Sequence, residues 1–122
     1  MRVFNLDTGQ ELAARAGVAD NLWTRGRGLL GRRALPNGEG LVIEHCRQIH
    51  MFFMAFPLDV IHVQRVSAEE GRVTRVLANL RPYHIGPLVW HSDYVVELPA
   101  GTAARTGTAV GHRVGLSPAA TG

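Results

Sequence analysis

The spacing of hydrophobic residues changes near Gly40. Before it, residues 12–32 (LAARAGVADNLWTRGRGLLGR) give the most helix-like pattern in the chain, with Asp20 as a candidate N-cap. The glycines in this segment weaken the pattern, since each costs about 1 kcal/mol inside a helix. We therefore expect one or two short helices in the N-terminal third. The apolar side would be supplied by Leu22, Trp23, Leu29 and Leu30.

The rest of the chain reads mainly as short strands rich in β-branched residues. Residues 68–71 (AEEG) predict a hairpin loop, and residues 99–107 predict a turn or a single helical turn. The strands are expected at residues 1–6, 41–45, 58–66, 72–78, 93–98 and 109–116.

This pattern predicts a mainly β fold, a small β-barrel or sandwich of short, mostly antiparallel strands. A chain of 122 residues fits one domain by size. We expect this domain to span residues 1–116 and residues 117–122 to form a flexible tail.

Composition adds little to the fold and more to the expected location. All 13 basic residues are Arg, and the net charge is only +3 although the pI is about 10.0. One Cys excludes an internal disulfide. The N-terminus has no apolar signal-peptide core, and no run approaches the roughly 18 apolar residues of a membrane span. We expect a cytoplasmic protein with no membrane partner.

The single basic cluster is RGRGLLGRR. Together with Trp23 it could contact phosphate or a single strand of nucleic acid. A solvated face is the favoured interpretation, because the net charge is modest and no nucleic-acid module is recognised. Nucleic acid is therefore disfavoured as a partner. The cluster consists of Arg25, Arg27, Arg32 and Arg33.

The segment HMFFMAFPLDVIHV, residues 50–63, combines soft metal ligands with apolar side chains. Cys46, His50 and Met54, with Met51 beside them, could bind Cu(I). Cys46 and His50 could instead be a nucleophile and its base. The favoured interpretation is that the Met and Phe side chains fill the core. We therefore expect no metal and no cofactor.

Two carboxylates lie within predicted strands, Asp59 in LDVIHVQRV and Glu97 in DYVVEL. Alternation puts Asp59 on the face of Ile61 and Val63, which we take as the core face. A buried carboxylate needs backbone N–H groups or an Arg partner, and we favour such a structural role. The alternative is acid–base catalysis with His50.

Four sequence blocks give the chain a resemblance to the DUF192 (UPF0127) family, a bacterial and archaeal group without an established biochemical function. They are RGLLGR with the following LP and GL, IHMFFM with PLDVI, the LRP element, and VVELPAG. The resemblance implies a compact, mostly β domain with a short helix before the central block. The family often has Gly-Asp before the last strand, whereas here His112 follows Gly111.

These observations predict a non-catalytic binding or accessory module. Its small pocket is expected near His50, Asp59 and Glu97, with Met54 as a further ligand-binding candidate, and its partner is an unspecified small ligand or protein. Two alternatives stay open. One is a small hydrolase using His50, Asp59 and Glu97, and the other is a soft-metal binder using Cys46, His50 and Met54.

Overall fold

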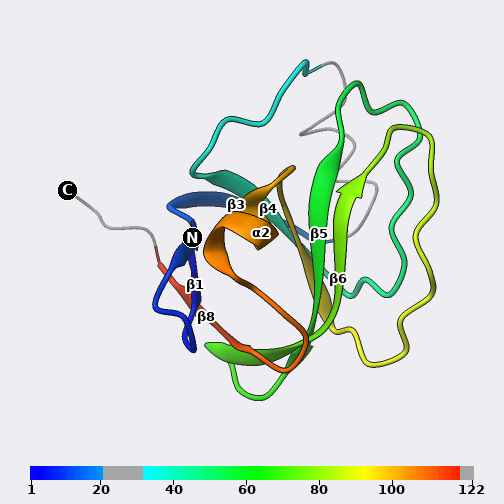
Figure 1. The fold of residues 1–122 in the computed structure, drawn as a ribbon. Helices are drawn as coiled ribbons and strands as arrows, with labels where there is room; N and C mark the ends of the chain where they lie inside the picture. Colours follow the sequence, from blue (N-terminus) through cyan, green and yellow to red (C-terminus); the bar gives the residue numbers. More distant parts are fainter. Residues whose placement is uncertain (21–31, 119–122) are drawn as a thin grey trace.

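The structure, a computed structural model, describes residues 1–20 and 32–118 (Figure 1). Its strands form one sheet, and one short helix lies between the last two strands. The elements are β1 (Arg2–Asn5), β2 (Glu11–Ala13), β3 (Arg15–Ala19), β4 (Glu39–Glu44), β5 (Leu58–Arg65), β6 (Glu70–Leu80), β7 (Tyr94–Pro99), α2 (Thr102–Thr106) and β8 (Arg113–Ser117).

The sheet has the order β2-β1-β8-β6-β5-β7-β4-β3. Among the described strands only β3 and β4 run parallel, so the expectation of a mainly β, mostly antiparallel fold is confirmed. The expected barrel is wrong, because the sheet is open between its edge strands β2 and β3. The backbone N–H of Ala16 donates to the carbonyl of Met1 at 2.8 Å near this opening, where no strand ladder forms.

The expected helical segment is wrong where the structure describes it. Residues 11–13 and 15–19 form the edge strands β2 and β3. Their tertiary contacts override the weak local preference, because Leu12, Ala13 and Ala16 are buried in the core. The rest of the predicted helix, including its apolar residues at 22–30, lies outside the described residues. The single helical turn expected within residues 99–107 is confirmed as α2.

The central strands β4, β5 and β7 are buried on both faces of the sheet. On the inner face, Ile61 and Val63 pack with residues of β1, β2 and β8, around which the sheet curls (Figure 1). On the outer face, Leu58 and Val60 pack against the loop of residues 45–57, to which the loop of residues 81–91 is hydrogen-bonded. Asp59 does lie on a core face, as expected, but the opposite face is core as well.

The last strand, β8, overlaps the strand expected at residues 109–116. Ser117 ends β8 and pairs with Arg2 of β1, so the first and last strands of the chain are neighbours. Most of the expected tail, residues 119–122, lies outside the described residues.

Candidate functional site

The two outer loops lie side by side and are joined by backbone hydrogen bonds (Figure 1). The N–H of Met51 donates to the carbonyl of His84 at 2.8 Å, and the N–H of Tyr83 donates to the carbonyl of Met51 at 2.7 Å. Further along, the N–H of Gly86 donates to the carbonyl of Ile49 at 2.8 Å. The loops therefore form an ordered layer over the outer face of the sheet.

The side chains of loop 45–57 divide between the core and the surface. Ile49, Met51, Met54 and Phe56 are buried in the outer-face cluster. Phe52 and Phe53 are exposed, so the expectation that all Phe side chains of this segment fill the core is wrong for them. Backbone pairing between the loops fixes which side chains face inward, and the sequence pattern alone does not reveal that pairing.

Each loop contains a tight turn with an aromatic residue in a left-handed backbone conformation. In one turn the N–H of Met54 donates to the carbonyl of Met51 at 3.3 Å, and Phe53 has φ of 63°. In the other the N–H of His84 donates to the carbonyl of Arg81 at 3.2 Å, and Tyr83 has φ of 66°. Glycine or asparagine is the usual residue at such a position, and a bulky side chain there is strained.

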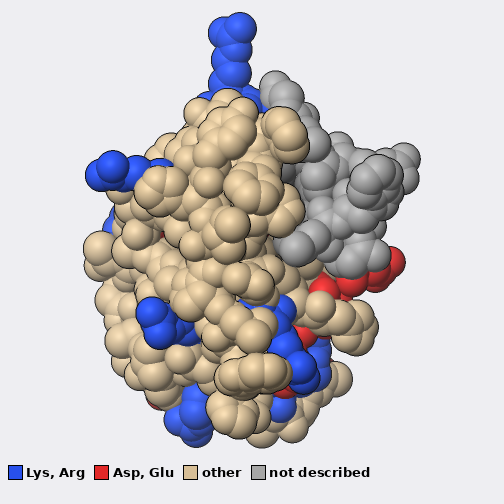
Figure 2. Space-filling model, turned by 90° about the vertical axis from the view of Figure 1, so that its right-hand side faces the viewer, with Lys and Arg blue, Asp and Glu red and all other residues tan. Residues whose placement is uncertain are grey.

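The two turns bring their aromatic rings together at the surface. The rings of Phe53 and Tyr83 meet edge to face with centroids 6.1 Å apart, and their side chains are 71% and 60% exposed. Beside them, the ring of His50 stacks on that of Phe52 with centroids 4.9 Å apart. The backbone of His50 forms an antiparallel β-bridge with the exposed Ile85. We call these five residues the aromatic patch. Figure 2 faces the side of the molecule that carries the outer loops, and much of it is uncharged.

Asp59, a predicted site residue, accepts three backbone N–H groups on the inner face. One carboxylate oxygen accepts the N–H of Asn79 at 2.8 Å. The other accepts the N–H groups of Gly101 and Ala103 at 3.1 and 2.8 Å. The carboxylate thus connects β5 to β6 and to the start of α2, and this geometry leaves it poorly placed for proton transfer.

Glu97 lies on the other face of the sheet from Asp59. In the register of β5 with β7, Glu97 pairs with Val60, whereas Asp59 pairs with Leu98. Paired residues of antiparallel strands project to the same face, so Glu97 faces outward and Asp59 inward. The four predicted site residues therefore do not gather in one pocket. His50 belongs to the aromatic patch, and Met54 is buried in the core beneath it.

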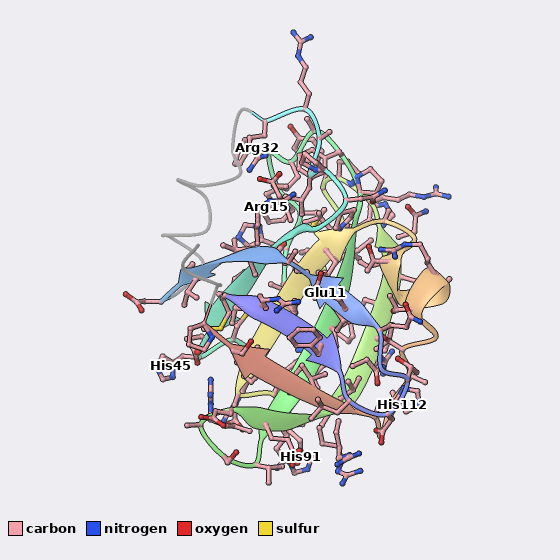
Figure 3. All side chains as sticks on the ribbon, turned by 90° about the vertical axis from the view of Figure 1, so that its left-hand side faces the viewer. Glu11, Arg15, Arg32, His45, His91 and His112 are labelled. Carbon is pink, nitrogen blue, oxygen red and sulfur yellow. The ribbon has the colours of Figure 1, made fainter. Side chains whose placement is uncertain are left out.

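The soft-metal candidates are also divided between core and surface. The thiol of the buried Cys46 contacts the carbonyl of Gln48 at 3.4 Å, while Nδ1 of the half-buried His50 accepts the N–H of Phe52 at 3.3 Å. Within residues 1–20 and 32–118, no three His, Cys, Asp or Glu side chains are grouped to hold a metal ion. Figure 3 shows His45, His91 and His112 at three separate places on the molecule.

The sequence interpretation missed a buried polar chain formed by His62, Ser92 and the backbone of Cys46. The Ser92 hydroxyl donates to the Cys46 carbonyl at 2.7 Å and lies 2.8 Å from Nδ1 of His62. Ser92 must then accept the Nδ1 proton, so Nε2 of the neutral ring is an acceptor. Nε2 is buried and has no partner in the described chain. Burial, and then the charge of Arg75, lower the pKa of His62 to about 4.

A polar pocket of about 730 Å³ lies at the end of β5, lined by Arg65, Glu44 and Asp93 among others. One guanidinium nitrogen of Arg65 lies 2.8 and 2.9 Å from the two Glu44 oxygens. Asp93 accepts the backbone N–H of Arg65 at 2.7 Å, and the Arg65 guanidinium lies over the ring of Tyr94. The charges and hydrogen-bonding groups of these residues are paired with one another, so we assign the residues mainly a structural role.

His112, which follows Gly111 where the family resemblance implies an Asp, forms contacts that stabilise the fold. Its Nδ1 lies 3.1 Å from Nδ2 of Asn5 and accepts the N–H of Ala109 at 3.2 Å, beside the β1–β2 turn (Figure 3). Both neighbours are donors, and an Asp carboxylate could accept from them equally. His112 therefore supplies the acceptor that the Asp implied by the family resemblance would also supply.

The Arg cluster predicted from the sequence can be followed only in part. Arg32 pairs with Glu39 at 3.2 Å, and Arg33 is exposed. Arg25 and Arg27 lie outside the described residues.

No helix in the described part of the chain is both long and apolar enough to cross a membrane.

Comparison with known proteins places this chain in a family. The DUF192 family model, described as "Uncharacterized ACR", matches residues 4–116, and the chain belongs to this family. This confirms the resemblance inferred from the four sequence blocks. The family has no established catalytic function, and no curated protein matches the chain.

Two solved structures are similar. One is a protein of unknown function from Novosphingobium aromaticivorans DSM 12444, with a TM-score of 0.75 and 26% identity over 94% of this chain and 82% of that one. The other, from Sinorhizobium meliloti 1021, is described as a "putative transcription regulator". Its TM-score is 0.71, with 24% identity over 93% of this chain and 88% of that one, and the likeness concerns the fold alone.

Proposed function

We propose that this protein is a non-catalytic binding module, and that the aromatic patch is its contact surface for an apolar segment of a partner protein. The observation that carries the proposal is the pair of strained turns that hold Phe53 and Tyr83 at the surface. A left-handed conformation costs a non-glycine residue roughly 1–2 kcal/mol. Strain of this kind concentrates at functional sites.

Stability alone does not account for these two residues. Both side chains are largely exposed, so they contribute little burial to the core. Asn or Gly would relieve the strain of each turn. A partner that covers the rings would gain their apolar area, and aromatic side chains are enriched at the centres of protein interfaces.

The placement of the polar candidates also favours binding over catalysis. Asp59 is hydrogen-bonded to three backbone N–H groups on the inner face, and Glu97 faces the outer side of the sheet. Acid–base catalysis needs such groups within hydrogen-bond reach of one substrate. Of the predicted site, we retain His50 as part of the patch. The cytoplasmic location and the bacterial origin stay predictions.

The proposal is tested by selecting peptides from a random displayed library on the wild-type protein. The variant Phe53→Asn/Tyr83→Asn removes both rings and keeps residues that tolerate the left-handed conformation. We expect the enriched peptides to contain large apolar residues. Their affinity for the variant should be at least about tenfold weaker than for the wild type, as for interface hot spots.

Val66→Ser is the matched control, because Val66 is another exposed apolar residue, next to β5 and away from the patch. Peptides should bind this control as tightly as the wild type. Equal affinity for wild type and the double variant, or no enrichment, would overturn the proposal.

A further inference from the structure

The strand β6 is only partly covered by its neighbour β8. The two strands pair at Glu70, Gly71 and Arg72. One step further, the N–H of Val73 donates to the carbonyl of His112, and Val73 accepts the N–H of Gly111, both at 2.8 Å. From Thr74 onward, no described strand lies on this side of β6 (Figure 1).

The uncovered part of β6 is therefore an open sheet edge. It continues to Leu80 and pairs with β5 on its other side. Every second residue of such an edge turns its N–H and C=O groups away from the sheet, and these groups can pair with another extended chain. Native proteins usually protect edges of this kind unless they are used for binding.

A groove of about 540 Å³ lies at the start of this edge. The β6 residues 72–75 line it, with Leu88 and Trp90 of the outer loop and Val110 on the remaining sides. Trp90 is 68% exposed, and the Arg47 guanidinium lies 6.0 Å from the centroid of its ring. The groove thus offers apolar side chains beside the open backbone edge.

The charge of the groove has one sign. Arg72 and Arg75 line it together with His91, and none of the described residues that line it is Asp or Glu. Arg72 donates to the carbonyl of Gly111 at 2.8 Å, which uses one of its five N–H donors. Neither Arg forms an ion pair within the described chain, in contrast to Arg2, Arg65 and Arg113. A carboxylate on a bound partner would pair with these two guanidinium groups.

We propose that this groove binds an extended acidic peptide, which adds to the open edge of β6 as a further strand. This site is separate from the aromatic patch and does not depend on its function. A second copy of the chain is a poorer occupant, because an edge-to-edge pair would bring the same Arg side chains together.

The register of β6 defines the sequence that such a peptide needs. Arg75 lies opposite His62 and Leu77 opposite Val60, so both project to the outer face. In an added strand, residues two apart project to this same face. One of them would meet the Arg75 guanidinium and the other the apolar side of Leu77. The peptide should therefore carry an Asp or Glu two residues from a large apolar residue.

The test uses a displayed library of extended peptides with β-branched residues at alternate positions and random residues between them. It is selected on the wild-type protein, and the enriched peptides are synthesised. We expect the acidic–apolar pattern, and a Kd at least about tenfold weaker for Arg75→Glu. A peptide with Arg in place of its acidic residue should recover affinity for this variant.

Two controls separate the proposal from simpler explanations. Arg81→Glu changes an exposed Arg outside the groove and should leave the affinity unchanged. The variant Phe53→Asn/Tyr83→Asn should also bind the peptides normally, so failure at the aromatic patch and failure here are distinguishable. The Tm of each variant is measured to establish that it is folded.

Strand addition makes a further prediction that charge attraction alone does not. On binding, amide hydrogen exchange of β6 residues 74–78 should slow, and a peptide methylated on its backbone nitrogens should not bind. Enrichment without acidic residues, equal affinity for Arg75→Glu, or unchanged exchange would overturn the proposal. The proposal would also be overturned if a single-stranded oligonucleotide displaced the peptides and its binding depended on Arg75. The groove would then be a nucleic-acid site.

Discussion

At the scale of single residues, the clearest anomaly is the hydroxyl group of Tyr94. The ring lies in the inner-face core, and the Arg65 guanidinium is 4.7 Å from its centroid. The hydroxyl is buried without a hydrogen-bond partner in the described part of the chain. Burial raises the pKa of Tyr94 to about 12. This hydroxyl has lost its hydration and has gained no bond in return.

Replacing Tyr94 with Phe should therefore leave the protein at least as stable. Removing an unsatisfied buried group recovers its desolvation cost, which is about 1–3 kcal/mol at most. We expect the free energy of unfolding from urea titration to be unchanged or higher. Tyr94→Leu is the contrasting variant, because it also removes ring packing and should destabilise. A loss of about 1 kcal/mol for Tyr94→Phe, the worth of a typical hydrogen bond, would contradict this account.

Single residues also show where sequence reasoning about the site fell short. The structural role of Asp59 follows from a general rule, since a buried carboxylate needs donors, and three backbone N–H groups supply them. Phe53 and Tyr83 gave no comparable signal. Nothing in their identity indicates a left-handed backbone, and an aromatic residue in an apolar run predicts burial.

At the scale of secondary structure, β1 and the strands β4 to β8 were predictable, whereas β2 and β3 were not. Residues 58–65 contain four β-branched or aliphatic residues and sit at the centre of the sheet. In contrast, β3 (RAGVA) contains Gly17 and no dense β-branched run. It forms a strand because β4 pairs with it in parallel, a long-range contact that local patterns do not encode.

The contact between β5, β6 and α2 depends on one carboxylate, which makes a sharp prediction. Asp59→Ala removes the acceptor of three backbone N–H groups, one at Asn79 of β6 and two at the start of α2. Hydrogen bonds to a charged group contribute roughly 1.5–3 kcal/mol each at most, and they are not additive. We expect the free energy of unfolding to fall by about 3 kcal/mol or more.

The measurement is denaturant unfolding followed by circular dichroism. Asp59→Asn should lose less than Asp59→Ala, because it keeps one acceptor oxygen. Glu69→Ala, which removes an exposed carboxylate of the β5–β6 connection, should change stability by no more than about 0.5 kcal/mol. Similar stabilities for Asp59→Ala and Glu69→Ala would show that the carboxylate does not hold these elements together.

At the scale of the whole molecule, the outer loops give a small sheet a second core and leave aromatic side chains at the surface. The sheet alone would expose the outer face of β4, β5 and β7, and the loops cover it with Met51, Met54 and Phe56. The same backbone pairing turns Phe52 and Phe53 outward. The core and the proposed contact surface therefore depend on each other, and this is why the composition of residues 50–56 was ambiguous.

That second core contains His62, which couples the stability of the whole molecule to pH. Its pKa is lowered to about 4 in the folded protein, chiefly by burial, against 6.5 for the ordinary side chain. Between these values the unfolded chain binds the proton and the folded chain does not. Stability is therefore complete above about pH 6.5 and declines as the pH falls, by about 1.4 kcal/mol per pH unit, until about pH 4.

Urea titrations at several pH values between neutral and about 4 measure this slope. His62→Leu removes the titrating group and should flatten the profile over this range. His91→Gln, at an exposed position, should keep it. The pKa of Asp7 is lowered by its hydrogen bond from the backbone of Arg113, so its contribution is lost only below its ordinary value of 3.8. A profile as steep in His62→Leu as in the wild type would show that the loss of stability in acid arises from groups other than His62.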